Sequence, residues 1–312
     1  MRSVIRLRCF LSPSIPESEF FVRNDAVTLI QGGDSLDVLD RIVSTKIMDM
    51  SDLSRRNALF CHSNGRIYDM GSIFTISGSI LLSSSSSEKE ATRRKLVNGT
   101  SWDEECEVLI ADNAIFRISI FPFDFSTIVE LFGVDMEETS TDVLIEKDDH
   151  LFVKIKSTYG ILIDVLVKYE NLEKIVSLLR DSNFSEMDSE RLDRRRIMLG
   201  IREMCDVQGN LPDEVGLGEL VSNDKGCYPG QEVHARLESR GSKVKSICRI
   251  NGDYPLFLGK QKTPEFGTIS ISSASFYDGR ASGLALIRIG NSIPEVIKIE
   301  GNDYSLEVID HP

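Results

Sequence analysis

The sequence predicts an α+β fold built from two α/β subdomains and a small β-barrel at the C-terminus. Two patterns support this prediction. Apolar strands alternate with amphipathic helices as far as about residue 201, and after Gly241 only short β-rich segments remain, separated by glycine, proline and asparagine turns. The 312 residues, 41% of them hydrophobic, can fill more than one core. We place the domain boundary between residues 1–241 and 242–312.

The first third of the chain predicts a sheet covered by helices. Strands are expected at residues 27–30, 57–60, 67–76 and 79–82, and helices at 36–43 and 88–97. The serine run at 83–87 is compatible with a flexible linker, but Ser87 and Glu90 fit a capping box, which favours the helix. At the N-terminus, Arg6 and Arg8 alternate with apolar residues, which favours an opening strand over a transit peptide.

The remaining elements are expected to complete the body and form the barrel. Strands are expected at 107–111, 114–121, 151–155 and 161–167, and helices at 125–132 and 170–179. An arginine-rich segment at 191–201 closes the body, and a helix runs from about 229 to 239. The segments 245–250, 267–272, 283–289, 295–299 and 305–309 have the spacing of a small closed barrel or sandwich.

The composition excludes several classes of function. A net charge of −13 repels nucleic acid and anionic membrane, and no run approaches the ~20 apolar residues that span a bilayer. The six cysteines form no C-x-x-C pair, and the four histidines are isolated from one another. We therefore expect no metal site held by this chain alone, reduced thiols and a cytoplasmic location.

Residues 225–232, Lys-Gly-Cys-Tyr-Pro-Gly-Gln-Glu, carry the strongest chemical signal. Cys227 lies beside a lysine at an expected helix start, where unpaired N–H groups and the helix dipole favour a thiolate. The alternative is a small buried hydrophobic residue between ordinary turn formers.

This octapeptide resembles the signature of the YgfZ-type folate-binding proteins. These are relatives of the glycine-cleavage T-protein, an aminomethyltransferase, and of iron–sulfur cluster assembly factors. Four weaker similarities occur in the same order along the chain. They are the segments 27–35 (Val-Thr-Leu-Ile-Gln-Gly-Gly-Asp-Ser), 64–69 (Asn-Gly-Arg-Ile-Tyr-Asp), 196–201 (Arg-Ile-Met-Leu-Gly-Ile) and 211–217 (Leu-Pro-Asp-Glu-Val-Gly-Leu).

The resemblance implies a three-lobed ring whose central hole binds tetrahydrofolate or a derivative. The chain departs from the family pattern at two places. The paired acids of the T-protein hairpin become Tyr68 and Asp69, so Asp69 is the one remaining candidate for the catalytic carboxylate, or else a turn residue. The family glutamate that handles the pterin becomes Met198, a thioether that cannot replace a carboxylate, and Glu203 is the nearby candidate substitute.

The motif residues supply the other candidates. Cys227 would be an activated thiol at the mouth of the folate hole, and Lys225 would lower its pKa or bind the folate tail, unless it pairs with Asp224. Further candidates for cofactor binding are Tyr228, Gln231, Glu232 and Arg236. Arg236 is either a carboxylate clamp or the partner of Glu232 in a surface salt bridge.

The arginine run at 194–196 leaves two interpretations open. It attracts a polyglutamate tail or an acidic partner, or it is a solvated face paired with Asp188, Glu190 and Asp193, which is the commoner situation.

Three functions follow from the resemblance. The first is a tetrahydrofolate-binding accessory protein that supports iron–sulfur cluster assembly or repair through Cys227, with iron–sulfur proteins or their assembly machinery as partners. The second is a folate-dependent aminomethyltransferase or methyltransferase of one-carbon metabolism. The third is a non-enzymatic scaffold that has lost folate. The cysteine motif favours the first.

Overall fold

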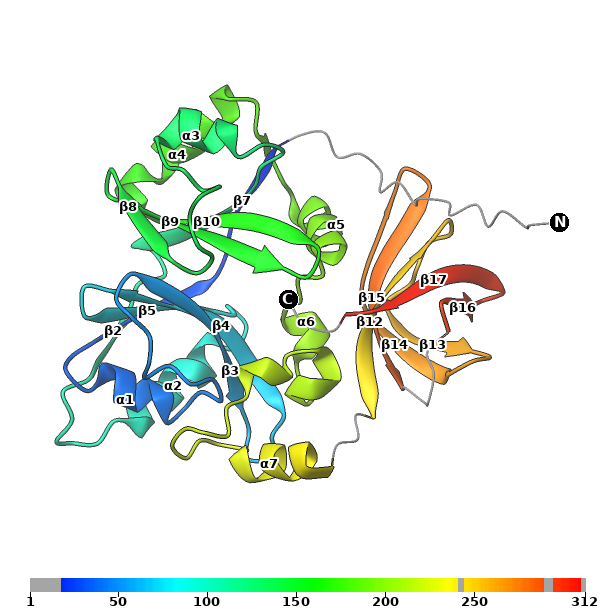
Figure 1. The fold of residues 1–312 in the computed structure, drawn as a ribbon, viewed down its shortest axis with the longest axis horizontal. Helices are drawn as coiled ribbons and strands as arrows, with labels where there is room; N and C mark the ends of the chain where they lie inside the picture. Colours follow the sequence, from blue (N-terminus) through cyan, green and yellow to red (C-terminus); the bar gives the residue numbers. More distant parts are fainter. Residues whose placement is uncertain (1–17, 241–243, 289–293, 310–312) are drawn as a thin grey trace.

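The computed structural model describes residues 18–240, 244–288 and 294–309 and contains three sheets (Figure 1). We call them the N-terminal sheet, the middle sheet and the C-terminal sheet. No helix in the described part of the chain is both long and apolar enough to cross a membrane.

The N-terminal sheet has five strands in the order β3-β4-β5-β2-β6. They are β2 (Ala26–Gln31), β3 (Ser54–Cys61), β4 (Ile67–Ile76), β5 (Ser79–Ser84) and β6 (Glu107–Ile110). Helices α1 (Ser35–Asp40) and α2 (Lys89–Gly99) cover one face, where Ile30 of the sheet packs with Val38 and Leu96 of the helices.

The middle sheet has six strands in the order β11-β1-β7-β10-β9-β8. They are β1 (Glu19–Val22), β7 (Ile115–Phe121), β8 (Leu144–Lys147), β9 (His150–Ser157), β10 (Gly160–Lys168) and β11 (Ser185–Glu186). Helices α3 (Ser126–Phe132) and α4 (Tyr169–Asp181) cover its outer face. Because β1 precedes every strand of the N-terminal sheet, the two halves are interleaved along the chain.

The inner faces of these two sheets pack on each other over part of their area. Val27 and Phe74 of the N-terminal sheet share one apolar core with Val153 and Leu162 of the middle sheet. The resulting order of layers is helix, sheet, sheet, helix. Beyond this core the sheets do not fill the space between them, and that space is the site described below.

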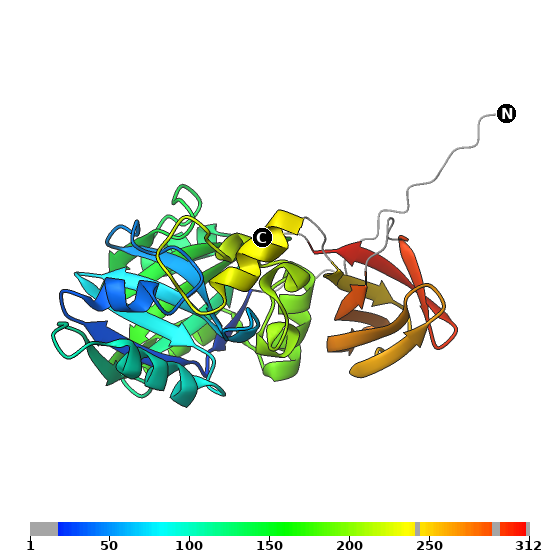
Figure 2. The ribbon, with the colours of Figure 1, turned by 90° about the horizontal axis from the view of Figure 1, so that it is seen from below.

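A helical segment connects the two sheets to the C-terminal sheet. It contains α5 (Ser189–Leu199), α6 (Met204–Val207), the 3₁₀ turns η1 (Pro212–Val215) and η2 (Gly218–Leu220), and α7 (Gln231–Arg240). In Figure 2 this segment lies between the paired sheets and the C-terminal sheet.

The C-terminal sheet is a strongly curved half-barrel of six strands in the order β13-β14-β15-β12-β17-β16. They are β12 (Lys245–Gly252), β13 (Gly259–Thr263), β14 (Gly267–Tyr277), β15 (Arg280–Arg288), β16 (Val296–Ile299) and β17 (Asn302–Val308). A closed barrel or a sandwich was expected, but within the described residues no strand pairing joins β16 to β13.

A buried network joins the half-barrel to α6. The Asp206 carboxylate accepts hydrogen bonds from Arg196 Nη1 at 2.6 Å and from Ser272 Oγ at 2.6 Å, and a third from Ser273 Oγ at 2.5 Å. The two serines lie at a β-bulge in β14. Asp206 and Arg196 are each only 2% exposed, so this is a fully buried ion pair whose other hydrogen-bonding sites are also satisfied.

The structure confirms the mixed fold and most of the expected elements. The strands β1, β8, β11 and β13 were not predicted. The predicted capping box is wrong, because the residue that precedes α2 is Glu88, and its side chain makes no capping hydrogen bond. The serine run is not a linker, since Ser83 and Ser84 are buried in β5. The strand predicted at the N-terminus lies outside the described residues.

Candidate functional site

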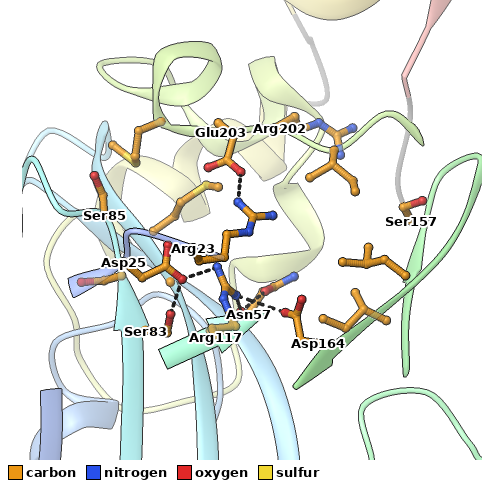
Figure 3. Close-up of a pocket in the computed structure, with 18 of the residues that line it drawn as sticks. Arg23, Asp25, Asn57, Ser83, Ser85, Arg117, Ser157, Asp164, Arg202 and Glu203 are labelled. Carbon is orange, nitrogen blue, oxygen red and sulfur yellow. Dashed lines mark hydrogen bonds and ion pairs between the residues drawn. The ribbon is translucent and has the colours of Figure 1, made fainter. Parts of the chain in front are cut away.

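A cavity of about 430 Å³ opens between the N-terminal and middle sheets, and the helical segment from α5 to η2 closes one side of it (Figure 3). This volume lies in the range of small-molecule sites. The lining residues come from all three parts: β3, β4 and β5, then β7, β9 and β10, and then α5 to η2.

An ion pair connects two sides of the cavity. Arg23 lies in the link between β1 and β2, and Glu203 directly precedes α6. Arg23 Nη1 lies 2.5 Å from Glu203 Oε1, and Arg23 Nε donates to Ser119 Oγ at 2.9 Å. The Arg23 side chain is 9% exposed, whereas the Glu203 side chain is 34% exposed and lines the cavity.

The ion pair keeps both groups charged. Burial by itself lowers the pKa of Arg23, but the negative charges of Glu203, Asp25 and Asp164 outweigh it, and the net pKa is raised. Burial likewise raises the pKa of Glu203, but Arg23 outweighs that effect and the net pKa is lowered. Glu203 is therefore an ionised hydrogen-bond acceptor at neutral pH.

A second set of ion pairs forms the floor of the cavity. Arg117 Nη2 lies 2.5 Å from Asp25 Oδ2, and Arg117 Nη1 lies 3.3 Å from Asp164 Oδ2. Ser83 Oγ donates to Asp25 at 2.6 Å, and Ser119 Oγ donates to Asp164 at 2.6 Å. These carboxylates already accept hydrogen bonds within the protein, so they have little capacity left to accept a hydrogen bond from a ligand.

The charge of the cavity lining is opposite in sign to that of the whole chain. Five cationic and three anionic side chains line it: Arg23, Arg55, Arg117, Lys156 and Arg202 against Asp25, Asp164 and Glu203. Lys156 is exposed at the rim, and no ion pair among the described residues involves it. The cavity of an otherwise acidic protein therefore favours a ligand with negative charge.

The rest of the lining is divided between apolar and hydroxyl side chains. The apolar members are Phe21, Ala58, Leu59, Met70, Ile155, Leu162, Leu192, Ile201, Met204, Leu217 and Leu220. Residues 83–86 of the serine run supply one wall. An apolar surface with a few fixed polar groups is typical of small-molecule sites.

Glu203 lines the cavity, whereas Met198, at the position of the family glutamate that handles the pterin, does not.

Asp69, the candidate catalytic carboxylate, also lies away from the cavity. The Asp69 side chain is fully buried, and its carboxylate accepts hydrogen bonds from Thr92 Oγ1, from the Met70 N–H at 2.8 Å and from the Ser85 N–H at 3.3 Å. Burial raises the pKa of Asp69 to about 6.

Lys225 is a buried structural residue. Its ammonium donates to the carbonyl oxygens of Asp40 at 2.5 Å, of Val43 at 2.9 Å and of Thr45 at 2.9 Å, and it lies 3.1 Å from Asp40 Oδ1. These groups belong to the C-terminal end of α1 and the loop after it. The expected pairing with Asp224 is wrong, because Asp224 pairs with Lys46. Lys225 is not part of the cavity lining, and its donors are occupied, which argues against folate binding.

Tyr228 and the following turn also have structural contacts. Tyr228 is buried, and its hydroxyl lies 3.2 Å from His234 Nδ1, while His234 Nε2 lies 2.8 Å from the Gly65 carbonyl oxygen. Gly230 has φ +92°, and a Cβ there would lie 2.8 Å from the Gly65 Cα. The motif therefore packs the start of α7 onto the β3–β4 turn.

Cys227 is exposed and does not line the cavity, so the expected place at its mouth finds no support. Gln231, Glu232 and Arg236 are absent from the lining too. Arg236 Nη2 lies 2.6 Å from Glu232 Oε1, and both side chains are largely exposed, so the surface salt bridge is the correct alternative for this pair.

The side chains of the arginine run are largely withdrawn from solvent, since those of Arg194, Arg195 and Arg196 are 11%, 15% and 2% exposed. Arg195 Nε lies 2.8 Å from Oε2 of the fully buried Glu19, and Arg194 Nη2 lies 4.0 Å from its Oε1. Arg194 also stacks on the ring of Tyr277, with 3.9 Å from its Cζ to the ring centroid. Of the acids expected as partners, Asp193 does pair, with Arg196 at 2.6 Å.

Four residues at the centre of the cavity were not predicted from the sequence: Arg23, Asp25, Arg117 and Asp164. They come from the β1–β2 link, β7 and β10, which the fold alone brings together. The one local signal is the polar triplet Arg-Asn-Asp at 23–25, which lies between two strands rich in apolar residues. Among the described residues, no group of three or more His, Cys, Asp or Glu side chains is arranged to hold a metal ion.

No protein-family model matches the chain, and no curated protein matches it. Solved structures with a similar fold do match the chain. The glycine cleavage system aminomethyltransferase T from Bartonella henselae superposes with a TM-score of 0.79 over 94% of this chain and 85% of that chain, at 12% sequence identity. The fold is that of this aminomethyltransferase. A heterotetrameric sarcosine oxidase from Corynebacterium sp. U-96 is more distant, with a TM-score of 0.41, 12% identity, and 55% of this chain and 87% of that chain covered.

Proposed function

We propose that the protein binds a reduced folate, tetrahydrofolate or a derivative, in the cavity at the centre of a three-lobed arrangement. We further propose that it acts as a YgfZ-type accessory protein for iron–sulfur cluster assembly or repair rather than as a transferase. The observation that carries the folate proposal is the ionised carboxylate of Glu203 in the cavity of an aminomethyltransferase fold.

The hydrogen-bond acceptor that Glu203 offers in the cavity fits a pterin. A pterin carries two neighbouring donors, the N3–H and the 2-amino group, and the Glu203 carboxylate has lone pairs to accept from them while it stays bound to Arg23. The ring would lie against apolar side chains such as Phe21 and Leu162. Glu203 would thus take the role of the acid that Met198 replaces.

The excess of cationic side chains fits the rest of the ligand. A folate ends in one or more glutamate residues, each of which adds a negative charge. Lys156 at the rim offers an exposed ammonium to these carboxylates. An ammonium at the surface attracts such a group by a screened, salt-dependent interaction, so a longer polyglutamate tail should raise the affinity at low ionic strength.

The geometry favours binding over aminomethyl transfer. A transferase needs a carboxylate at the reacting one-carbon unit, and Asp69 is fully buried away from the cavity. Asp25 and Asp164, which do line the cavity, are paired with Arg117. This arrangement supports the accessory protein over the one-carbon transferase.

The accessory role rests on Cys227. Lys225, Tyr228 and Gly230 are buried and fixed by their contacts, whereas Cys227 between them is exposed. A thiol on the outside of a rigid turn is accessible to an iron–sulfur protein or to its assembly machinery.

Anaerobic isothermal titration calorimetry with tetrahydrofolate and a polyglutamyl form tests the folate proposal. We expect the wild-type protein to bind both, and Glu203→Gln to weaken binding about 10- to 100-fold, because an amide is a poorer, uncharged acceptor. Met198→Glu is the matched control, since residue 198 does not line the cavity and should leave the affinity unchanged. If tetrahydrofolate binds neither the wild type nor Met198→Glu, folate is eliminated as the ligand. If only Met198→Glu binds it, the role of Glu203 is overturned.

A further inference from the structure

Arg23 offers the cavity a hydrogen-bond donor beside the Glu203 acceptor. The Arg23 guanidinium uses Nη1 for Glu203 and Nε for Ser119, and within the described residues Nη2 makes no hydrogen bond. In Figure 3 Arg23 lies at the centre of the cavity, with one nitrogen directed to Glu203 and another away from it.

The position of Arg23 is fixed. The chain on either side of it is anchored in two different sheets, in β1 and in β2, and its side chain is 9% exposed. Ser119, which holds Nε, itself donates to the buried Asp164. A guanidinium is always charged and cannot accept a hydrogen bond, so this part of the cavity presents a donor at every physiological pH.

We propose that Arg23 determines specificity for the 4-oxo form of the pterin ring, an inference that rests on the proposed folate site. The lactam edge of a folate carries a donor, N3–H, next to an acceptor, the oxygen at C4. The Glu203–Arg23 pair presents the complementary acceptor and donor. In a 4-amino pterin, the group at C4 donates and neutral N3 carries no hydrogen. The Arg23 contact at C4 and the N3–H contact with Glu203 are then lost, and only the 2-amino contact with Glu203 remains.

The expected discrimination is large because both protein groups are charged and the Arg23 side chain is almost fully buried. A site built to hydrogen-bond a group rejects an analogue that leaves its own polar atoms unpaired. We expect tetrahydrofolate to bind about 10- to 100-fold more tightly than tetrahydroaminopterin, its 4-amino counterpart with the same tail and the same reduction state.

Anaerobic calorimetry of the full chain with these two ligands tests the proposal. Arg23→Met should bring the two affinities to within about threefold of each other, whereas Arg23→Lys, which keeps a charged donor, should retain a preference for the 4-oxo form. Phe21→Leu, which alters an apolar lining residue, should weaken both ligands alike and leave the ratio intact.

If Arg23→Met fails to fold, the ratio of the wild-type affinities for tetrahydrofolate and tetrahydroaminopterin still decides the test. Equal wild-type affinities for the two ligands would overturn the role of Arg23 while leaving the folate site in place. An unchanged ratio in a folded Arg23→Met would do the same. If the wild type binds neither ligand, the proposed function itself fails.

Discussion

Replacing Lys225 by methionine tests whether the octapeptide is a structural frame. The Lys225 side chain is 1% exposed, and its ammonium holds three carbonyl oxygens and the carboxylate of Asp40. Burial lowers the pKa of Lys225, an effect that its hydrogen bond and ion pair with Asp40 oppose. Methionine keeps most of the side-chain volume but removes the charge and all donors.

The loss should be large, because breaking a buried ion pair leaves an uncompensated charge. Such changes cost about 3–5 kcal/mol, and here three carbonyl oxygens lose their donor as well. The Asp40 carboxylate keeps one hydrogen bond, from the Ile47 N–H at 3.1 Å, which favours the lower end of that range. We expect the free energy of unfolding to fall by about 3 kcal/mol and Tm by about 6 °C or more.

Urea unfolding at pH 7 and differential scanning calorimetry measure this change. Arg236→Ala is the control in the same region, because it removes an exposed salt bridge, and it should alter Tm by no more than about 1–2 °C. If Lys225→Met is as stable as Arg236→Ala, the buried ammonium contributes nothing to the fold and the reasoning fails.

Three further predictions concern the hairpin and the motif. Asp69 has a folded-state pKa of about 6 against an ordinary value of 3.8, so the native state holds the proton more tightly and the free energy of unfolding falls as pH rises from about 4 to 6. In urea titrations between pH 4 and 7, the free energy of unfolding of Asp69→Asn should therefore rise by about 3 kcal/mol relative to that of the wild type. Parallel pH dependences of the two proteins would contradict this. Gly230→Ala should lower the free energy of unfolding by about 2 kcal/mol or more, because its φ is +92° and the added Cβ meets Gly65; a stable variant would mean that the turn can move. Cys227→Ala should keep wild-type Tm and folate affinity yet lose activity in complementation of iron–sulfur enzymes, and full complementation would refute the role of the thiol.

Local patterns were enough to predict most of the secondary structure. The expected strand at residues 67–76 coincides with β4, and the expected helix at 170–179 lies within α4, because apolar periodicity is strong in both. The short strands β8 and β13 were missed, since four or five residues with mainly exposed side chains carry little periodic signal.

The candidate site was only partly predictable. Glu203 could be proposed because it lies close in sequence to the position of Met198, and it does line the cavity. Arg23 and Arg117 are nearly 100 residues apart, and the pairing of β1 with β7 brings them together. Lys225 looked like a ligand because a lysine beside a cysteine suggests chemistry, and nothing in the sequence shows that α1 ends against its ammonium.

The structure of the protein with tetrahydrofolate bound would show directly whether the cavity is the folate site. We predict that the pterin lies between the N-terminal and middle sheets, with its N3–H or 2-amino nitrogen about 3 Å from the Glu203 carboxylate. A folate bound elsewhere on the molecule, or a cavity without ligand at saturating tetrahydrofolate, would contradict the account.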